Sequence, residues 1–178
     1  MKLMTDRYQQ VEPGAVGLWF SDADGPILFR CDTEGHRIVV SDADGHVKYT
    51  FGGFGRQPGA LDTPLDIAFV RPEFLGEPVL ADGADALWLA VADYGNRRVQ
   101  VFELDGVLVG TIDEDMFDTD IGAPCALSWR APALEIEGVD GVKTRIHLGA
   151  ALLGNGPAPA TMPTVFHVRR PREFWENC

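Results

Sequence analysis

An internal repeat constrains this chain more than any other feature, because a repeat sets the architecture of the whole fold. Residues 32–45 read DTEGHRIVVSDADG, and residues 93–106 read DYGNRRVQVFELDG. In each copy an Asp precedes an Arg by five positions, and an Asp-Gly pair follows. The two copies are 93 − 32 = 61 positions apart, counted from their first Asp residues, Asp32 and Asp93. The chain is therefore predicted to contain repeated units of similar structure.

Each copy predicts a turn, a strand and a second turn. The stretches IVVS and VQVF are rich in β-branched residues and alternate as strands do, and the Asp-Gly pairs provide hairpin turns in which positive φ is needed. Upstream of the first copy, GLWFSDADG and PILFRCD predict two more strands, and downstream HVKYTFGG predicts a fourth. Such a four-stranded meander of about 40 residues has the size of one propeller blade.

The second copy extends in the same way. Its predicted strands are TPLDIAFV at 63–70, LWLAVAD at 87–93, RRVQVFELDG at 97–106 and VLVGTI at 107–112. An insertion at 71–86 separates the first two, and loops of this length are often functional or face a partner.

The stretches VADYGNRRVQVFELDGVLVGTI and CDTEGHRIVVSDADGHVKYTFGGFG resemble the NHL repeat family, with its Asp-x-Gly-Asn-x-Arg-Val turn, strand, Asp-Gly turn and closing strand. The resemblance covers residues 13–112. A third copy begins at GAPCALSW, where Pro124 follows Pro64 by 124 − 64 = 60 positions. Its later part, TRIHLGAALLG and TVFHVRR, lacks both the Asp-to-Arg spacing and the Asp-Gly turn.

The resemblance implies an all-β fold: a single domain over 1–178 that forms a partial β-propeller of about three four-stranded blades. The expected units are blade 1 at 13–55, blade 2 at 60–112, a degenerate blade 3 at 121–170 and a C-terminal tail at 171–178. The family suggests a six-bladed ring, and propellers need roughly four to eight blades to close. We therefore expect a second copy or another subunit to complete the ring, unless the sheets stack openly.

The repeated residues are interpreted as structural, because recurrence marks architecture before chemistry. A guanidinium–carboxylate contact can fix the same turn in each copy. This set comprises Asp32, Arg37, Asp44, Gly45, Asp93, Arg98, Asp105 and Gly106.

No catalytic residue, cofactor or metal site is predicted. The two SDADG stretches have carboxylates two residues apart, as calcium loops do, but neither continues with the spacing of an EF-hand. The four histidines show no short metal-ligand spacing, and no Ser-His-Asp order or GxSxG motif occurs. The candidates for partner contact are aromatic: Phe74 in the insertion, Tyr94 in the repeat turn, and Phe174 with Trp175 in the tail.

Charge argues against several partners. The chain has 15 Lys plus Arg against 27 Asp plus Glu, a net charge of −12, so it is expected to bind neither nucleic acid nor a membrane surface. A cytoplasmic location is expected for three reasons. The three cysteines are widely spaced, the first residues contain no apolar stretch like that of a secretion signal, and no apolar run approaches the roughly 18 residues of a membrane span.

Together these features predict a non-catalytic protein-binding or assembly module, a small accessory subunit or half-propeller whose partner is a protein, either in a homodimer or in a larger complex. The alternative is a propeller-type lyase or hydrolase with a metal site formed at an oligomer interface. Fold alone does not decide between them, because propellers host both classes.

Overall fold

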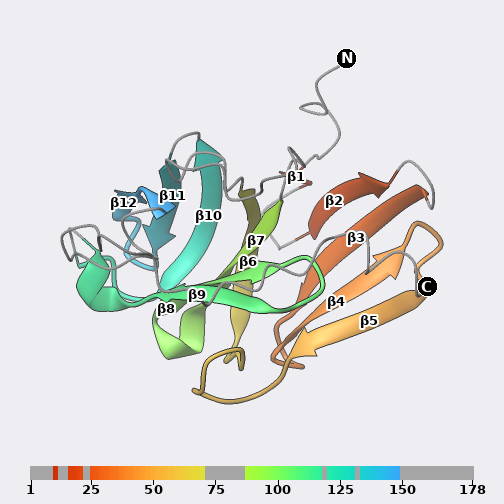
Figure 1. The fold of residues 1–178 in the computed structure, drawn as a ribbon. Helices are drawn as coiled ribbons and strands as arrows, with labels where there is room; N and C mark the ends of the chain where they lie inside the picture. Colours follow the sequence, from red (N-terminus) through yellow and green to blue (C-terminus); the bar gives the residue numbers. More distant parts are fainter. Residues whose placement is uncertain are drawn as a thin grey trace, which may run out of the picture.

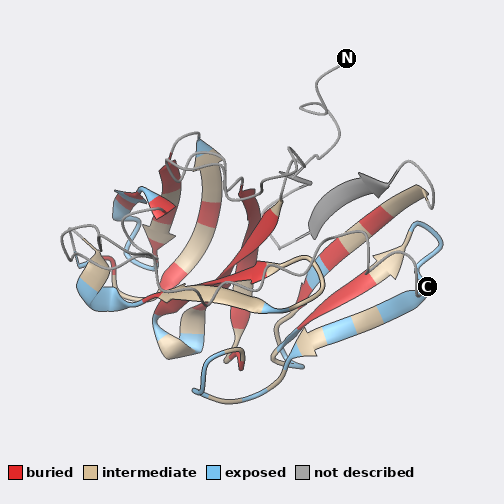
Figure 2. Ribbon diagram, viewed as in Figure 1, coloured by how far each residue is buried: buried red, intermediate tan, exposed pale blue. Residues whose placement is uncertain are grey.

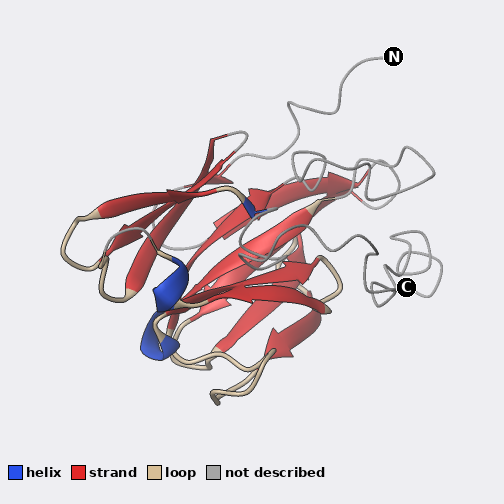
Figure 3. Ribbon diagram, turned by 60° about the vertical axis from the view of Figure 1, so that its left-hand side comes forward, coloured by secondary structure: helices blue, strands red, loops and turns tan. Residues whose placement is uncertain are grey.

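The structure is a computed structural model that describes residues 10–11, 16–21, 25–70, 87–117, 120–130 and 133–148. Over these ranges the chain is all-β, as predicted: strands dominate, with short 3₁₀ turns at Tyr94–Asn96 (η3) and Glu114–Met116 (η4) (Figure 3). No helix in the described part is both long enough and apolar enough to cross a membrane. The insertion at 71–86 and the tail at 171–178 lie outside the described residues.

The strands form three antiparallel meanders in chain order (Figure 1). The first sheet contains β1 (Gln10–Val11), β2 (Val16–Ser21), β3 (Gly25–Asp32), β4 (Arg37–Asp42) and β5 (Val47–Gly52). The second contains β6 (Pro64–Val70), β7 (Trp88–Asp93), β8 (Arg98–Glu103) and β9 (Leu108–Ile112). The third contains β10 (Pro124–Arg130), β11 (Ala133–Gly138) and β12 (Lys143–Ile146).

Strands β2 to β9 lie where the repeat predicts them, whereas β1 is a fifth strand of the first sheet that lies outside the expected blade at 13–55. The two copies also share their register, because Asp32 pairs with Arg37 across β3 and β4, and Asp93 pairs with Arg98 across β7 and β8. The third sheet has three strands within the described residues, and the rest of the expected blade, from residue 149 onward, lies outside them.

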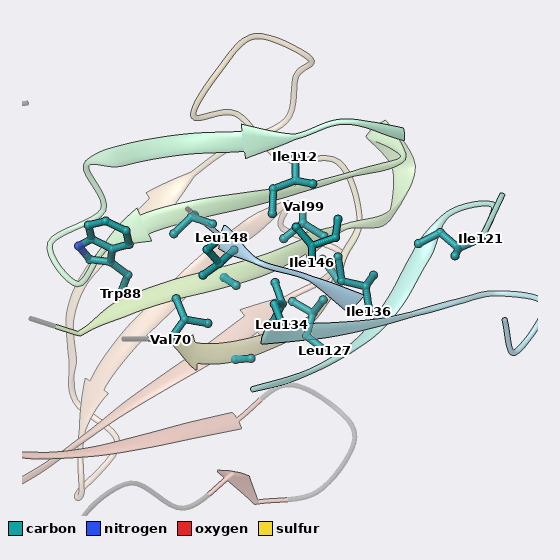
Figure 4. Packing of buried hydrophobic residues seen from close by; sticks show 14 residues of the cluster. Val70, Trp88, Val99, Ile112, Ile121, Leu127, Leu134, Ile136, Ile146 and Leu148 are labelled. Carbon is teal, nitrogen blue, oxygen red and sulfur yellow. The ribbon is translucent and has the colours of Figure 1, made fainter. Parts of the chain in front are cut away.

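The three sheets lie in series, with the second in the middle (Figure 1). Strand β6 packs against β2 and β3 on one side and against β10 on the other. Two apolar cores fill the spaces between sheets. The first core joins the first and second sheets around Phe29, Ile38, Leu89 and Phe102. The second core joins the second and third sheets; its larger members, drawn in Figure 4, include Val70, Trp88, Val99, Ile112, Leu127, Leu134 and Ile136.

This order explains the burial pattern in Figure 2. Every residue of β7 is buried, because the second sheet is covered on both faces and successive side chains point to opposite faces. In β5, at the edge of the first sheet, exposed and half-buried residues alternate instead. Full burial of one large apolar side chain contributes roughly 1.5–3 kcal/mol, so the two cores hold the sheets together.

Candidate functional site

The first Asp-Arg turn closes at the surface. Arg37 Nε donates to Asp32 Oδ2 at 2.7 Å, and the Gly35 amide donates to Asp32 Oδ1 at 3.1 Å. The hydrogen bond from Arg37, with help from the Gly35 amide, lowers the pKa of Asp32. The Arg37 side chain is 49% exposed, so this ion pair is solvated.

The second Asp-Arg turn has the same contact in a buried setting. Arg98 Nε donates to Asp93 Oδ2 at 2.7 Å, and the side chains are only 10% and 0% exposed. The remaining guanidinium N–H groups donate to the carbonyls of Arg56, Gln57 and Ala60. These carbonyls belong to the linker loop, residues 53–63, which connects the first sheet to the second. Arg98 therefore fastens the linker loop to the second sheet.

The Asp93 carboxylate gathers further donors around the same loop. Its Oδ1 accepts the Asp62 amide at 2.7 Å, and its two oxygens accept the Asn96 side-chain amide at 3.1 and 2.9 Å. Gln100 Nε2 donates both to Asp93 Oδ2 and to the Ala60 carbonyl. A buried carboxylate with this many donors is committed to holding backbone in place.

The Asp-Gly pairs form hairpins of one kind. In the first sheet the Gly45 amide donates to the Asp42 carbonyl at 3.1 Å, and in the second the Gly106 amide donates to the Glu103 carbonyl at 3.0 Å. Both glycines have positive φ, 86° and 88°, which glycine adopts without steric cost.

The third sheet has an Asp-Gly hairpin too, at another place than in the repeat and before the segments that are expected to lack the motif. The Gly141 amide, at φ 74°, donates to the Gly138 carbonyl at 2.9 Å, with Asp140 directly before it. This hairpin joins β11 to β12, where the first two sheets have the Asp-Arg turn. Gly138 pairs with Pro124 as Asp93 pairs with Pro64, so a glycine stands where the motif has its Asp.

Asp66 was not singled out from the sequence, yet it bonds the second sheet to the third. Its Oδ2 accepts the amide of Leu127 in β10 at 2.7 Å, and its Oδ1 accepts the amide of Ile67 at 2.9 Å. Asp66 is 4% exposed, and burial raises its pKa despite the two donors. The only sequence signal was a charged residue inside the otherwise apolar strand LDIAFV.

Two cysteines lie in described strands, one buried and one half-buried. Cys31 in β3 is buried, and burial followed by the Asp66 charge raises the pKa of its thiol. Burial also raises the pKa of Cys125 in β10, with smaller effects from Glu137 and Asp66. Both thiols are therefore held in their protonated form, which is the less reactive one.

One group of potential metal ligands is present in the described part. Single ligand atoms of Asp42, Asp44 and His46 lie within 4.8 Å of one another in the β4–β5 hairpin. Asp42 Oδ1 already accepts the amides of Asp44 and His46, and these bonds, that of His46 first, lower its pKa. The hairpin accounts for this arrangement, since Asp44 and His46 are exposed and acidic turns commonly adopt it without an ion.

A joint between the first and second sheets is made by side chains of the first Asp-Arg turn and the linker loop. Thr33 Oγ1 donates to the Pro64 carbonyl at 2.9 Å, and His36 Nδ1 accepts the Thr63 amide at 3.0 Å. The His36 ring also meets the Phe54 ring edge-on at 4.8 Å between centroids. Phe54 is 72% exposed, the highest value among the described large apolar residues, and it was not singled out from the sequence.

Of the aromatic residues predicted to contact a partner, only Tyr94 is described. It begins η3 and is half-buried, and its carbonyl accepts the Arg97 amide at 3.1 Å. Phe74, Phe174 and Trp175 lie outside the described residues, so their role as contacts stays a prediction.

The outward face of the third sheet is charged. Lys143 Nζ lies 2.9 Å from Glu137 Oε2, and Arg145 Nη2 lies 3.1 Å from Glu135 Oε2. By strand alternation these four side chains face away from Leu134 and Ile136, which are in the core. On the first sheet, Leu28, Arg30 and Val39 face outward in the same way, between core residues of β3 and β4.

Comparison with known proteins assigns no family. The chain matches no protein-family model, and no curated protein matches it. The resemblance to NHL repeats therefore stays a prediction that depends on the two sequence copies.

Proposed function

We propose that the chain is a non-catalytic protein-binding or assembly module, part of an NHL-like propeller ring that a second copy or another polypeptide completes. The observation that carries this proposal is the serial order of the sheets. Among the described strands, β6 contacts both neighbouring sheets, and the apolar core of the first sheet and that of the third are each shared with the second. A propeller sheet needs a neighbour on each face, so both ends of the series await one.

The two ends differ in what they can accept. The third sheet offers ion pairs such as Lys143 with Glu137, and their desolvation in a sheet-to-sheet contact would be costly. By strand alternation the Arg37–Asp32 ion pair lies on the outward face of the first sheet, but this face also has apolar side chains, the half-buried Leu28 and Val39, which is 5% exposed. We therefore expect the outward face of the first sheet to make the stronger contact with the completing chain, and the charged face of the third sheet to make the weaker one.

The buried polar groups of the described part support a structural use of the repeat motif. Asp93 and Arg98 hold the linker loop, and Asp66 holds β10. Each buried charge is thus engaged in contacts between sheets and loops. The metal-dependent lyase or hydrolase remains the sequence-based alternative, and elemental analysis of the purified protein tests it, with a stoichiometric metal as the result in its favour.

Light scattering on the full chain and two matched charge reversals tests the docking face. Arg30→Glu and Arg145→Glu make the same change of charge on the outward faces of the first and third sheets. We expect a wild-type mass of about twice 19.4 kDa, or a complex with a distinct co-purifying polypeptide, and a larger loss of that complex in Arg30→Glu than in Arg145→Glu.

Equal loss in both variants would contradict the proposed difference between the two end faces. Loss in Arg145→Glu alone would contradict the assignment of the faces. A wild-type chain that stays a monomer and binds no polypeptide would contradict the proposed function itself.

A further inference from the structure

Thr63, the last residue of the linker loop, is held in an unfavourable backbone conformation. Its φ is +52°, in the left-handed region that β-branched residues avoid. Such strain persists only where the surroundings enforce it, and it concentrates at switch regions. Two hydrogen bonds enforce it here: the Thr63 amide donates to His36 Nδ1 at 3.0 Å, and Thr63 Oγ1 donates to Asp62 Oδ1 at 3.0 Å.

The first of these bonds fixes the protonation of His36. An imidazole nitrogen accepts a hydrogen bond only through a free lone pair, so Nδ1 carries no proton and the ring is neutral with its proton on Nε2. The same Nδ1 lies 3.3 Å from Asp62 Oδ1, and in this state two acceptors face each other. A proton added to Nδ1 changes its hydrogen-bond partner. The new N–H donates to Asp62, and Nδ1 no longer has a lone pair that could accept from the Thr63 amide.

We propose that His36, Asp62 and Thr63 form a proton-operated joint between the first and second sheets. Neutral His36 holds the strained Thr63 by its amide. Protonated His36 loses that bond and donates to Asp62 Oδ1 instead, so one proton releases the restraint on the Thr63 amide. The side chain of His36 is 28% exposed, which gives the proton a path from solvent.

Few charged groups lie near His36. The linker loop packs against His36 and contributes Asp62 and Arg56, and the turn that carries His36 contributes Asp32, Glu34 and Arg37. Asp32 and Arg37 are paired with each other at 2.7 Å. Asp62 is thus the group within reach of a proton on Nδ1. Histidine is the side chain that ordinarily changes charge between pH 5 and 8.

The repeat provides an internal control. Arg97 stands at the position of His36 in the second copy and shares its left-handed backbone, at φ 55° against 54°. Its guanidinium pairs with Glu114 at 2.7 Å and stays charged at every physiological pH. The second copy therefore has no titratable imidazole at this position.

Amide NMR on the full chain between pH 5 and 8 tests the proposal. The protection factor of the Thr63 amide is expected to fall roughly 2- to 12-fold at low pH, which corresponds to the loss of one hydrogen bond. The fall should have the same midpoint as the protonation of the His36 ring observed in the same experiment. The Arg97 amide should keep its protection. His36→Asn retains an acceptor oxygen, tolerates positive φ and does not titrate, so it should abolish the pH dependence.

Two results would overturn the proposal. One is a Thr63 amide that does not respond while the His36 ring titrates, or that responds equally in His36→Asn. The other comes from ¹⁵N shifts of the wild-type imidazole, which need no variant: a proton on Nδ1 at pH 8 is incompatible with the joint. Neither readout depends on oligomeric state, so failure here is distinct from failure of the proposed function.

Discussion

The two Asp-Arg turns allow one interaction to be measured at the surface and in the interior of the same molecule. Both ion pairs have the same Nε to Oδ2 distance of 2.7 Å, but Arg37 is 49% exposed and Arg98 only 10%. We expect Arg37→Ala to lower the free energy of unfolding by about 0–1 kcal/mol, as for other solvated pairs. Arg98→Ala should lower it by about 3–5 kcal/mol, because it leaves the Asp93 charge buried without its partner.

Arg98→Ala also removes the donors to the carbonyls of Arg56, Gln57 and Ala60, which places the expected loss in the upper part of that range. For a protein of this size, 3–5 kcal/mol corresponds to a Tm lower by roughly 6–20 °C. Urea unfolding followed by circular dichroism measures both variants, and added salt should reduce only the contribution of Arg37. Equal losses in the two variants, or a loss below 1 kcal/mol for Arg98→Ala, would refute this reasoning.

Three further variants probe the hairpins and the contact between the second and third sheets. Gly45→Ala and Gly106→Ala each place a side chain at positive φ at a cost of about 1–2 kcal/mol, but the new Cβ at Gly106 would lie 2.6 Å from Phe51 Cγ. Gly106→Ala should therefore lose about 1–3 kcal/mol more in thermal unfolding, and equal losses would show that Phe51 moves aside without cost. Burial raises the pKa of Asp66, so its carboxyl binds a proton more tightly folded than unfolded, and its contribution to stability falls as pH rises from about 4. Asp66→Asn removes this titration, so the variant should gain stability relative to wild type as pH rises in urea unfolding between pH 4 and 7; a constant or opposite difference would contradict this assignment.

The sequence predicted the local structure wherever the signal was local. The spacing from Asp93 to Arg98 identified a strand pair, and the Asp-Gly pairs identified hairpins, because such turns depend on a few neighbouring residues. The third sheet was harder to predict, since Gly138 stands at the place of the motif's Asp and the Asp140-Gly141 hairpin takes the place of the Asp-Arg turn.

Contacts between repeats could not be predicted in this way. The hydrogen bond from the Leu127 amide to Asp66 joins residues 127 − 66 = 61 positions apart, and neither residue belongs to the repeated motif. The burial of Arg98 depends on the linker loop, which belongs to the preceding repeat, so one motif yields a buried pair in one place and a solvated pair in another. The strain at Thr63 and its bond to His36 arise from the same packing of one repeat on the next.

In the proposed function, the three sheets in series form an incomplete ring that binds the chain which completes it. Native mass spectrometry of the protein purified from its own cells tests this most directly. We expect a defined complex, either two copies of the 19.4 kDa chain or one copy with a different polypeptide. A single unaccompanied chain under the same conditions would contradict it.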